Sequence, residues 1–179
     1  HLAREGWSDV ALIERAELTA GSTWHAAAGF HALNGDPNVA ALQQYTIGLY
    51  PQIEAESGIS CGLHMTGGVN VAADPARWEA LRGACATFHA IGIDTARLMD
   101  RAQIEALTKG IIRTDDLLGG LYDPTEGYLD PNGTTHAYAR AAQNRGADVI
   151  LRNRVIDLIP CADGWDVVTE QGTIRAEHV

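Results

Sequence analysis

Hydrophobic positions near the start of the chain form a short continuous run, Val10 to Ile13, bounded by Asp9 and Glu14. A short apolar run that ends in an acid is typical of a buried parallel strand. The preceding residues, His1 to Trp7, are interpreted as the last turn or two of a helix closed by Gly6, because glycine adopts the left-handed conformation that ends helices. The pattern therefore predicts a helix end, a tight turn and a parallel strand.

Three later helices are expected to begin at the same dipeptide, an aspartate followed by a proline. These dipeptides are Asp36-Pro37, Asp74-Pro75 and Asp130-Pro131. The aspartate carboxylate caps free N–H groups of the first turn, and proline suits the first helical position because its φ is fixed and it has no N–H. A further short helix is expected around Asp100 to Leu107.

Apolar residues recur at spacings of three and four along the first two of these helices, which predicts one packing face on each. The first face contains Val39, Leu42, Tyr45, Leu49 and Ile53, and the second contains Trp78, Leu81, Cys85 and Phe88. Pro51 is expected to kink the last turns of the first helix, and Gly58 is expected to end it.

Strand patterns follow in the middle and the last third of the chain. Strands are expected at Leu63 to Ala73, with a bulge or bend at Gly67-Gly68, and at Leu118 to Tyr122. A helix from Pro131 to about Arg145 should end at Gly146. The strands expected after it are Ala147 to Leu151, Arg154 to Ile159, Trp165 to Thr169 and Thr173 to Val179. The turns between the last three predict an antiparallel meander.

The order of these elements predicts an α/β fold in which part of a Rossmann-like cofactor domain is interrupted by an α+β insertion. The expected boundaries are 1–34 and 130–179 for the cofactor domain, and 35–129 for an inserted substrate-domain portion. In a dinucleotide-binding unit, an acid at the end of the second strand binds ribose and lies about 20 residues beyond the glycine-rich phosphate turn. Counting back from Glu14 places that turn before residue 1, so we expect the chain to be a fragment of a longer polypeptide.

Composition and charge exclude several classes of protein. The chain has 179 residues, of which 46% are hydrophobic, and its 23 acidic and 13 basic side chains give a formal charge of -10. With one lysine and no basic run, it lacks the electrostatic signature of a nucleic-acid or anionic-membrane binder. No apolar stretch approaches the roughly 18 residues of a membrane-spanning helix. The cysteines Cys61, Cys85 and Cys161 have no CxxC spacing, so neither a disulfide framework nor a zinc site is indicated.

The segment from the strand-end acid to Gly29, here called the cofactor loop (residues 14–29), combines small residues, hydroxyl groups and one imidazole. Gly21 and Gly29 permit close approach of the backbone to a ligand, and Ser22 and Thr23 can bind phosphate or ribose oxygens. The alanines at the end of the segment are expected to start a helix whose N–H groups favour an anion. These features predict a backbone wrapped around a ligand.

Three stretches of the chain carry a resemblance to a known family. They are Ile13-Glu14-Arg15 with Glu17 to Ala27, Gly119 to Pro124 with Gly127 and Asp130-Pro131, and the Gly164-Trp165 turn. They resemble the dimethylglycine and sarcosine dehydrogenases, which are flavoproteins of the D-amino-acid-oxidase-like group. The fold implied by this resemblance is a Rossmann-like FAD-binding domain with an inserted substrate-domain portion.

The resemblance also implies FAD as the cofactor and a set of residues that binds it. The set is Glu14, Arg15, Gly21, Ser22, Thr23, Trp24, His25, Ala26 and Val155. Glu14 is implied to hold the adenosine ribose, and Val155 to contact the adenine side through its backbone. His25 matches the histidine that bonds covalently to the flavin 8α-methyl group, a reaction that needs a neutral imidazole nitrogen as the nucleophile. Trp24 is either a lid over the flavin or a packing residue.

The activity implied by the resemblance is removal of hydride from the N-methyl group of a small amino acid, dimethylglycine or sarcosine, with delivery to flavin N5. The carbon would then pass to water or to tetrahydrofolate, and an electron acceptor would reoxidise the flavin. The location would be the cytoplasm of a bacterium or the mitochondrial matrix of a eukaryote. The alternatives are oxidation of another secondary or tertiary amine, or a regulatory relative without catalysis.

The chain departs from the family pattern at Ala28, where relatives often read Trp-His-Ala-Ala-Gly, so the backbone there is expected to be positioned differently. The phosphate turn, the catalytic substrate-domain residues and the folate-binding part have no counterpart in the chain. We therefore expect the isolated chain to be inactive and to bind FAD weakly. The catalytic residues are not identified.

A polar turn in the middle of the chain allows two interpretations. It contains Tyr122, Asp123, Glu126 and Tyr128. These side chains either face substrate or belong to a plain turn before the capped helix. Four further histidines, His31, His64, His89 and His136, show no metal-ligand spacing and are assigned no role.

Overall fold

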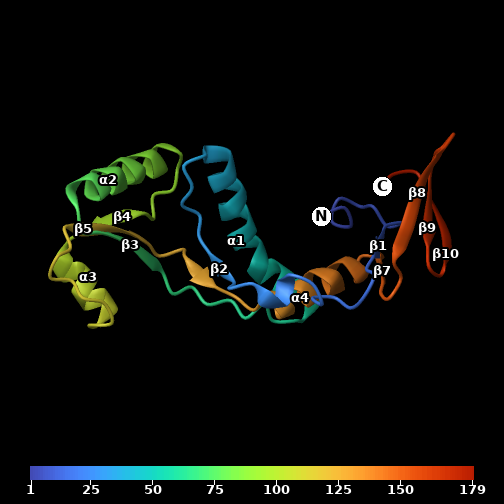
Figure 1. Cartoon of the computed structure of the whole chain (residues 1–179), viewed down its shortest axis with the longest axis horizontal. Helices are drawn as coiled ribbons and strands as arrows, with labels where there is room; N and C mark the ends of the chain where they lie inside the picture. Colours follow the sequence, from blue (N-terminus) through green and yellow to red (C-terminus); the bar gives the residue numbers. More distant parts are fainter. The chain divides into compact units, whose positions relative to one another are not determined.

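The computed structural model describes all residues from His1 to Val179 and divides into two compact units, each made of helices and strands (Figure 1). Unit 1 comprises His1–Ala27, Pro51–Cys61 and Asp130–Val179. Unit 2 comprises Ala28–Tyr50 and Gly62–Leu129. The sheets are mixed, with one parallel and several antiparallel pairings, so the expected α/β class is confirmed.

The parallel pair of unit 1 brings together two segments that are far apart in the sequence. Strand β1 (Ala11–Ile13) pairs with β7 (Asp148–Ile150), with Leu12 opposite Val149. The backbone N–H of Asp148 also donates to the carbonyl of Val10 at 2.8 Å. The parallel strand expected from the first apolar run is therefore confirmed in type and in place, but the expected burial is wrong, since Leu12 is 49% exposed.

The antiparallel meander of unit 1 follows β7 directly. Its strands are β8 (Val155–Cys161), β9 (Gly164–Thr169) and β10 (Gly172–Ala176), in the order β10-β9-β8. A register shift between Val155 and Asp157 marks a bulge at the start of β8. The meander was expected from the turns between these strands, at Asp163-Gly164 and Gln171-Gly172, and the structure confirms it.

Helix α4 (Pro131–Gln143) supports β7, against which it packs in unit 1. The Asp130 carboxylate accepts hydrogen bonds from the backbone N–H groups of Asn132 and Gly133, each at 3.0 Å. After the helix, the chain turns at Gly146, whose φ of 93° lies in the left-handed region.

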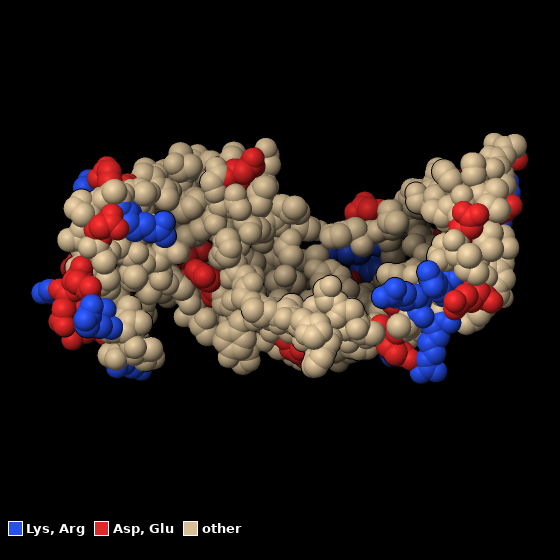
Figure 2. Space-filling model, in the orientation of Figure 1, with Lys and Arg blue, Asp and Glu red and all other residues tan.

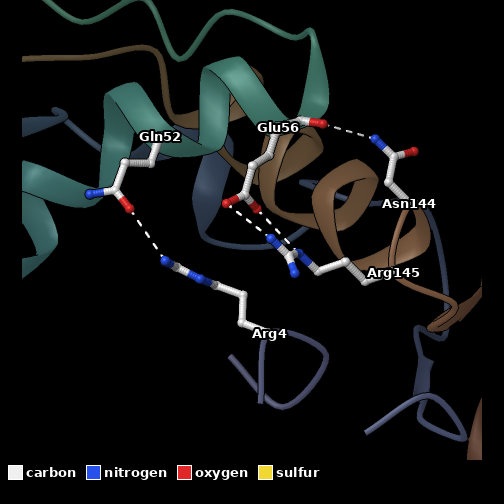
Figure 3. A network of polar contacts seen from close by, with 5 residues as sticks. All are labelled: Arg4, Gln52, Glu56, Asn144 and Arg145. Atoms are coloured by element: carbon white, nitrogen blue, oxygen red, sulfur yellow. Dashed lines mark hydrogen bonds and ion pairs between the residues drawn. The ribbon is translucent and has the colours of Figure 1, made fainter. Parts of the chain in front are cut away.

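A polar network in unit 1 joins the N-terminal segment and the end of α4 to the last turns of α1 (Pro37–Ser57), as Figure 3 shows. The two nitrogens of the Arg145 guanidinium approach the Glu56 carboxylate at 3.2 and 3.3 Å, and the Asn144 side chain donates to the Glu56 carbonyl at 2.9 Å. Arg4 donates to the Gln52 side chain at 3.3 Å. Such a paired guanidinium–carboxylate contact orients both side chains, so it holds this part of α1 in a defined place within unit 1.

Unit 2 contains two small sheets and most of the helices. The three-stranded sheet has β5 (Gly119–Asp123) in the middle, between β3 (Gly68–Ala72) and β4 (Arg97–Met99), and both pairings are antiparallel. The second sheet pairs β2 (Gly29–Phe30) with β6 (Gly127–Tyr128). Helix α2 (Pro75–Ala90) packs along the three-stranded sheet (Figure 1), and α3 (Arg101–Thr108) contacts β5.

The core of unit 2 lies between α2 and the three-stranded sheet. It contains Ala40, Ala72, Leu81, Cys85, Phe88, Ile93, Ala96 and Leu121. Three of the four α2 residues expected to form a packing face are buried here, and Trp78 packs partly buried against them. No helix in the chain is both long and apolar enough to span a membrane.

A helix starts at each of the three Asp-Pro dipeptides, because the capping hydrogen bonds of a first turn involve only neighbouring residues. The Asp74 carboxylate accepts from the N–H of Arg77 at 2.8 Å, and the Asp36 carboxylate accepts from the N–H groups of Asn38 and Val39 at 2.8 and 3.1 Å. The short helix expected near residue 100 is α3, which has a complete capping box between Asp100 and its third helical residue.

The expected packing face of α1 is wrong in its first half. Leu49 and Ile53 are buried, but the side chains of Val39, Leu42 and Tyr45 are exposed. A helical stripe predicts which residues share a face, but it does not predict how much of that face another element covers. The helix itself continues through Pro51 and ends at Ser57, before Gly58.

Two other expectations about secondary structure are also corrected. Residues 2–6 form hydrogen-bonded turns and no helix, although Gly6 has the expected left-handed φ of 93°. The strand expected over Leu63 to Ala73 starts only at Gly68, because Gly67 has a φ of 71° that breaks an extended chain. Before that point, only His64 forms a bridge, with Tyr128.

Candidate cofactor site

The first residue of the cofactor loop, Glu14, lies directly after β1, at the carboxyl end of the parallel pair. Its N–H donates to the Ile150 carbonyl at 2.8 Å, and its carbonyl accepts from the N–H of Asn153 at 3.0 Å. Its side-chain carboxylate accepts from the N–H of Ala16 at 2.8 Å. Ligands of open α/β sheets bind outside the carboxyl ends of parallel strands, so Glu14 occupies a position from which it can reach one.

The chain after β7 returns beside Glu14, which brings Val155 into the same part of unit 1. The N–H of Arg152 donates to the Ala16 carbonyl at 2.9 Å, and Arg152 has a left-handed φ of 54°. Val155 then begins β8 opposite Thr169, with 37% of its surface exposed. Glu14 and Val155 are 141 positions apart in the sequence, and the pairing of β1 with β7 joins their two segments.

Basic side chains accompany this strand end. Arg15, Arg152 and Arg154 are all exposed, and Arg152 forms an ion pair with Glu17. Figure 2 shows Lys and Arg side chains gathered over the end of unit 1 where β1, β7 and the meander lie, with acidic side chains beside them. In a chain with a formal charge of -10, this local concentration favours an anionic group such as a diphosphate.

The middle of the cofactor loop forms a short 3-10 helix, η1 (Thr23–His25), which packs against α4 in unit 1. The His25 N–H donates to the Ser22 carbonyl at 3.2 Å, and the Ala26 N–H donates to the Thr23 carbonyl at 3.1 Å. The helix expected at the following alanines is therefore wrong, because the helical turn comes earlier, Ala26 is extended and Ala28 has a positive φ.

The two aromatic rings of η1 lie against each other at the surface. The ring centroids of Trp24 and His25 are 4.6 Å apart, with 48° between the planes. Trp24 is 62% exposed, and His25 is also exposed. The His25 imidazole is thus accessible beside an aromatic surface.

The two loop glycines differ in their surroundings. A Cβ at Gly21 would meet no atom within 4 Å, so no contact within this chain requires glycine there. Gly29 belongs to unit 2, where it lies in β2 and pairs with Tyr128 of β6. Taken together, the strand-end acid, the exposed basic side chains, the open backbone at Gly21 and the accessible His25 fit a dinucleotide cofactor.

Ala28 has a left-handed φ of 65°, a conformation that glycine adopts freely and that costs other residues about 1 kcal/mol. We expect Ala28→Gly to raise the free energy of unfolding by up to about 1 kcal/mol. Part of this gain is offset, because glycine increases the conformational entropy of the unfolded chain. Denaturant unfolding measures the difference, with Ala27→Gly as the control, since Ala27 is not among the residues of positive φ. A loss of stability at Ala28 as large as that at Ala27 would contradict this expectation.

Unit 2 carries a polar cavity that the sequence did not indicate. It is lined by His31, Leu33, Asn70 and Glu126, which come from three separate stretches of the chain. From the sequence, Glu126 was expected only as one of the polar-turn residues that either face substrate or form a plain turn, and Gly68, against which its side chain lies, only as part of a bulge or bend. The chain contains no group of three or more His, Cys, Asp or Glu side chains that could hold a metal ion.

The chain is similar to proteins of known family along its whole length. The family model described as DAO, FAD dependent oxidoreductase, matches residues 1–179. The chain is 35% identical to mitochondrial dimethylglycine dehydrogenase of Rattus norvegicus and 34% identical to mitochondrial sarcosine dehydrogenase of Homo sapiens, over 100% and 99% of its length. It spans 21% and 19% of the length of these relatives, respectively.

A solved structure shows the same fold. The L-proline dehydrogenase from P. horikoshii matches 97% of this chain with a TM-score of 0.87 and 20% sequence identity, and the match covers 46% of that protein. At this identity the likeness concerns the backbone arrangement alone.

Proposed function

Because the chain belongs to the DAO family of FAD-dependent oxidoreductases, we propose that it is part of a flavoprotein that oxidises an N-methylated amino acid such as dimethylglycine or sarcosine. The observation that carries this proposal is the similarity to dimethylglycine and sarcosine dehydrogenases over nearly every residue of the chain. The accessible imidazole of His25, beside the exposed Trp24, supports it from the structure.

The residues of unit 1 hold the cofactor in this proposal. Glu14 accepts hydrogen bonds from the ribose hydroxyls, and the Arg15 side chain and the hydroxyl groups of Ser22 and Thr23 contact the phosphates. His25 would be the point of covalent attachment of the flavin. The FAD held by these residues would supply the hydride acceptor for oxidation of the N-methyl carbon. Trp24 shields one side of the His25 attachment from water.

The wider assignments form part of the same proposal. The cofactor domain corresponds to 1–34 and 130–179 and the substrate-domain portion to 35–129, while tetrahydrofolate takes up the released carbon elsewhere in the full-length protein. A separate electron acceptor reoxidises the flavin. The reaction takes place in the bacterial cytoplasm, or in the mitochondrial matrix if the source is a eukaryote.

The test of this function is anaerobic reduction of the flavin in the full-length protein. Dimethylglycine or sarcosine should bleach the visible flavin absorbance, and 3-methylbutanoate, which has carbon in place of the dimethylglycine nitrogen, should not. Bleaching only by amines that are not amino acids would replace the proposed substrate class. A full-length protein that contains no flavin would instead support a regulatory role.

A further inference from the structure

The cavity of unit 2 has a volume of about 150 Å³. About 10–15 Å³ of such space holds one water, so the cavity has room for a small molecule. Its lining contains one apolar side chain, Leu33, and three polar ones, His31, Asn70 and Glu126. In ligand sites, a few convergent polar groups fix the orientation of the bound molecule.

The chain makes specific room for the Glu126 carboxylate at the edge of this cavity. A Cβ added at Gly68 would collide with that carboxylate, and a Cβ at Gly67 would collide with the Tyr122 ring. The Glu126 backbone is held as well, since its carbonyl accepts from the N–H of Gly67 at 2.8 Å. The Gly67-Gly68 pair therefore allows the Glu126 side chain to lie over the start of β3. A larger residue at position 68 would occupy the same space.

The polar groups around the cavity favour a positively charged ligand that also carries a hydrogen-bond acceptor. No Lys or Arg side chain lines it, and the half-buried Glu126 has the fully buried Asp123 carboxyl as a neighbour of the same charge. The His31 Nδ1 lies 3.0 Å from the Leu33 carbonyl and donates to it as the N–H tautomer, so the Nε2 position remains for a ligand. The Asn70 amide offers both a donor and an acceptor.

We propose that this cavity binds the ammonium group of a small amino acid, with the Glu126 carboxylate and the His31 Nε2 as the acceptors that face its N–H, and with the Asn70 amide N–H donating to the adjoining carboxylate. A hydrogen bond between an ammonium N–H and a carboxylate is strong because both groups are charged. A partly buried carboxylate also gains from such a partner, because a buried charge without one is costly. The inference rests on the proposed function, because it assigns to unit 2 the recognition of the N-methylated amino acid.

The test measures binding by the flavin-loaded, full-length protein under anaerobic conditions, with dimethylammonium chloride as the cationic probe and 3-methylbutanoate as the carboxylate analogue that has carbon in place of nitrogen. We expect Glu126→Gln to weaken dimethylammonium binding about tenfold or more, because a charge-assisted hydrogen bond is lost. Binding of 3-methylbutanoate should change less than about twofold, since that ligand makes no bond of this kind. Equal affinity of wild type and Glu126→Gln for dimethylammonium would overturn the inference.

A second variant tests the position of the carboxylate without removing it. Gly68→Ala places a methyl group where the Glu126 carboxylate lies, and the end of that flexible side chain can move aside without unfolding the strand. We expect the same selective loss of dimethylammonium binding. The matched controls are Gly83→Ala, where a Cβ meets nothing within 4 Å, and Glu79→Gln on the exposed surface of α2. Both controls should bind like the wild type.

The pH dependence of binding has a defined sign. Burial raises the pKa of the Glu126 carboxyl above its ordinary value of 4.5; Asp123 raises it further, and His31 lowers it. Dimethylammonium affinity should therefore rise as pH increases through this raised pKa in the wild type, and Glu126→Gln should show no such rise. Because the folded protein holds this proton more tightly than the unfolded chain does, the free energy of unfolding of the wild type falls as pH increases. Glu126→Gln should therefore be more stable than the wild type at about pH 7. This difference should disappear below about pH 4, where the wild-type carboxyl is protonated in both states.

The results separate this inference from the function on which it rests. A protein whose flavin is not reduced by any N-methylated amino acid, but whose dimethylammonium binding depends on Glu126, would overturn the proposed substrate and support the cavity as an ammonium site. A protein that oxidises dimethylglycine with the same KM in the wild type and in Glu126→Gln would retain the function and exclude this cavity from recognition.

Discussion

Replacement of His25 with alanine is expected to abolish covalent attachment of flavin in the full-length protein. The wild-type chain, denatured and freed of small molecules, should keep its visible absorbance and a mass increased by one FAD. The His25→Ala chain should show neither. The expected effect is complete loss, because no cysteine or second histidine lies within the cofactor loop to replace the imidazole.

The control for this experiment is His136→Ala. His136 is exposed on α4 and lies outside the cofactor loop, so its removal changes the histidine content and leaves the residues of the loop unchanged. Flavin retained by this variant and lost by His25→Ala would support the proposed attachment. Flavin released on denaturation of the wild type would show that the cofactor is held without a covalent bond, and flavin retained by His25→Ala would move the attachment to another residue.

Gly127→Ala is expected to destabilise unit 2 by about 2–4 kcal/mol. A Cβ at this position in β6 would collide with the His64 backbone carbonyl and would lie 2.9 Å from the Phe30 ring. The His64 backbone is held by two hydrogen bonds with Tyr128, at 2.8 and 3.0 Å, so it cannot move away without breaking this bridge. The loss should therefore include both steric strain and at least one backbone hydrogen bond.

Denaturant unfolding of the full-length protein measures this effect, and amide hydrogen exchange locates it. Faster exchange should appear at Phe30, His64 and Tyr128, the positions around the added methyl group. The control is again Gly83→Ala, which we expect to be neutral or stabilising by about 0.5–1 kcal/mol, because alanine favours a helix interior over glycine. A Gly127→Ala protein as stable as Gly83→Ala would show that the β2–β6 region can rearrange.

The parts of the fold that the sequence predicted are those decided by interactions within a few residues. The Asp36, Asp74 and Asp130 caps were predicted because a carboxylate reaches only the N–H groups of the turn that follows it. The meander was predicted because its turns contain their own glycines. The family, with FAD as its cofactor, was also recognisable from the sequence, since the cofactor loop is continuous in the chain.

The features that only the tertiary structure decided depend on segments far apart in the chain. Strands β2, β4 and β6 have two or three residues each and exist only through their partners, so no periodic pattern marks them. The exposure of Leu42 depends on which elements cover α1, and its hydrophobic spacing carries no such information. Glu126 meets Gly68 because β3 pairs with β5, and His31 joins them from a third stretch. Interactions between neighbouring residues determine the secondary structure of a segment, and the sequence pattern reveals them. The lining of a cavity depends on which distant segments come together, and the sequence pattern does not contain that information.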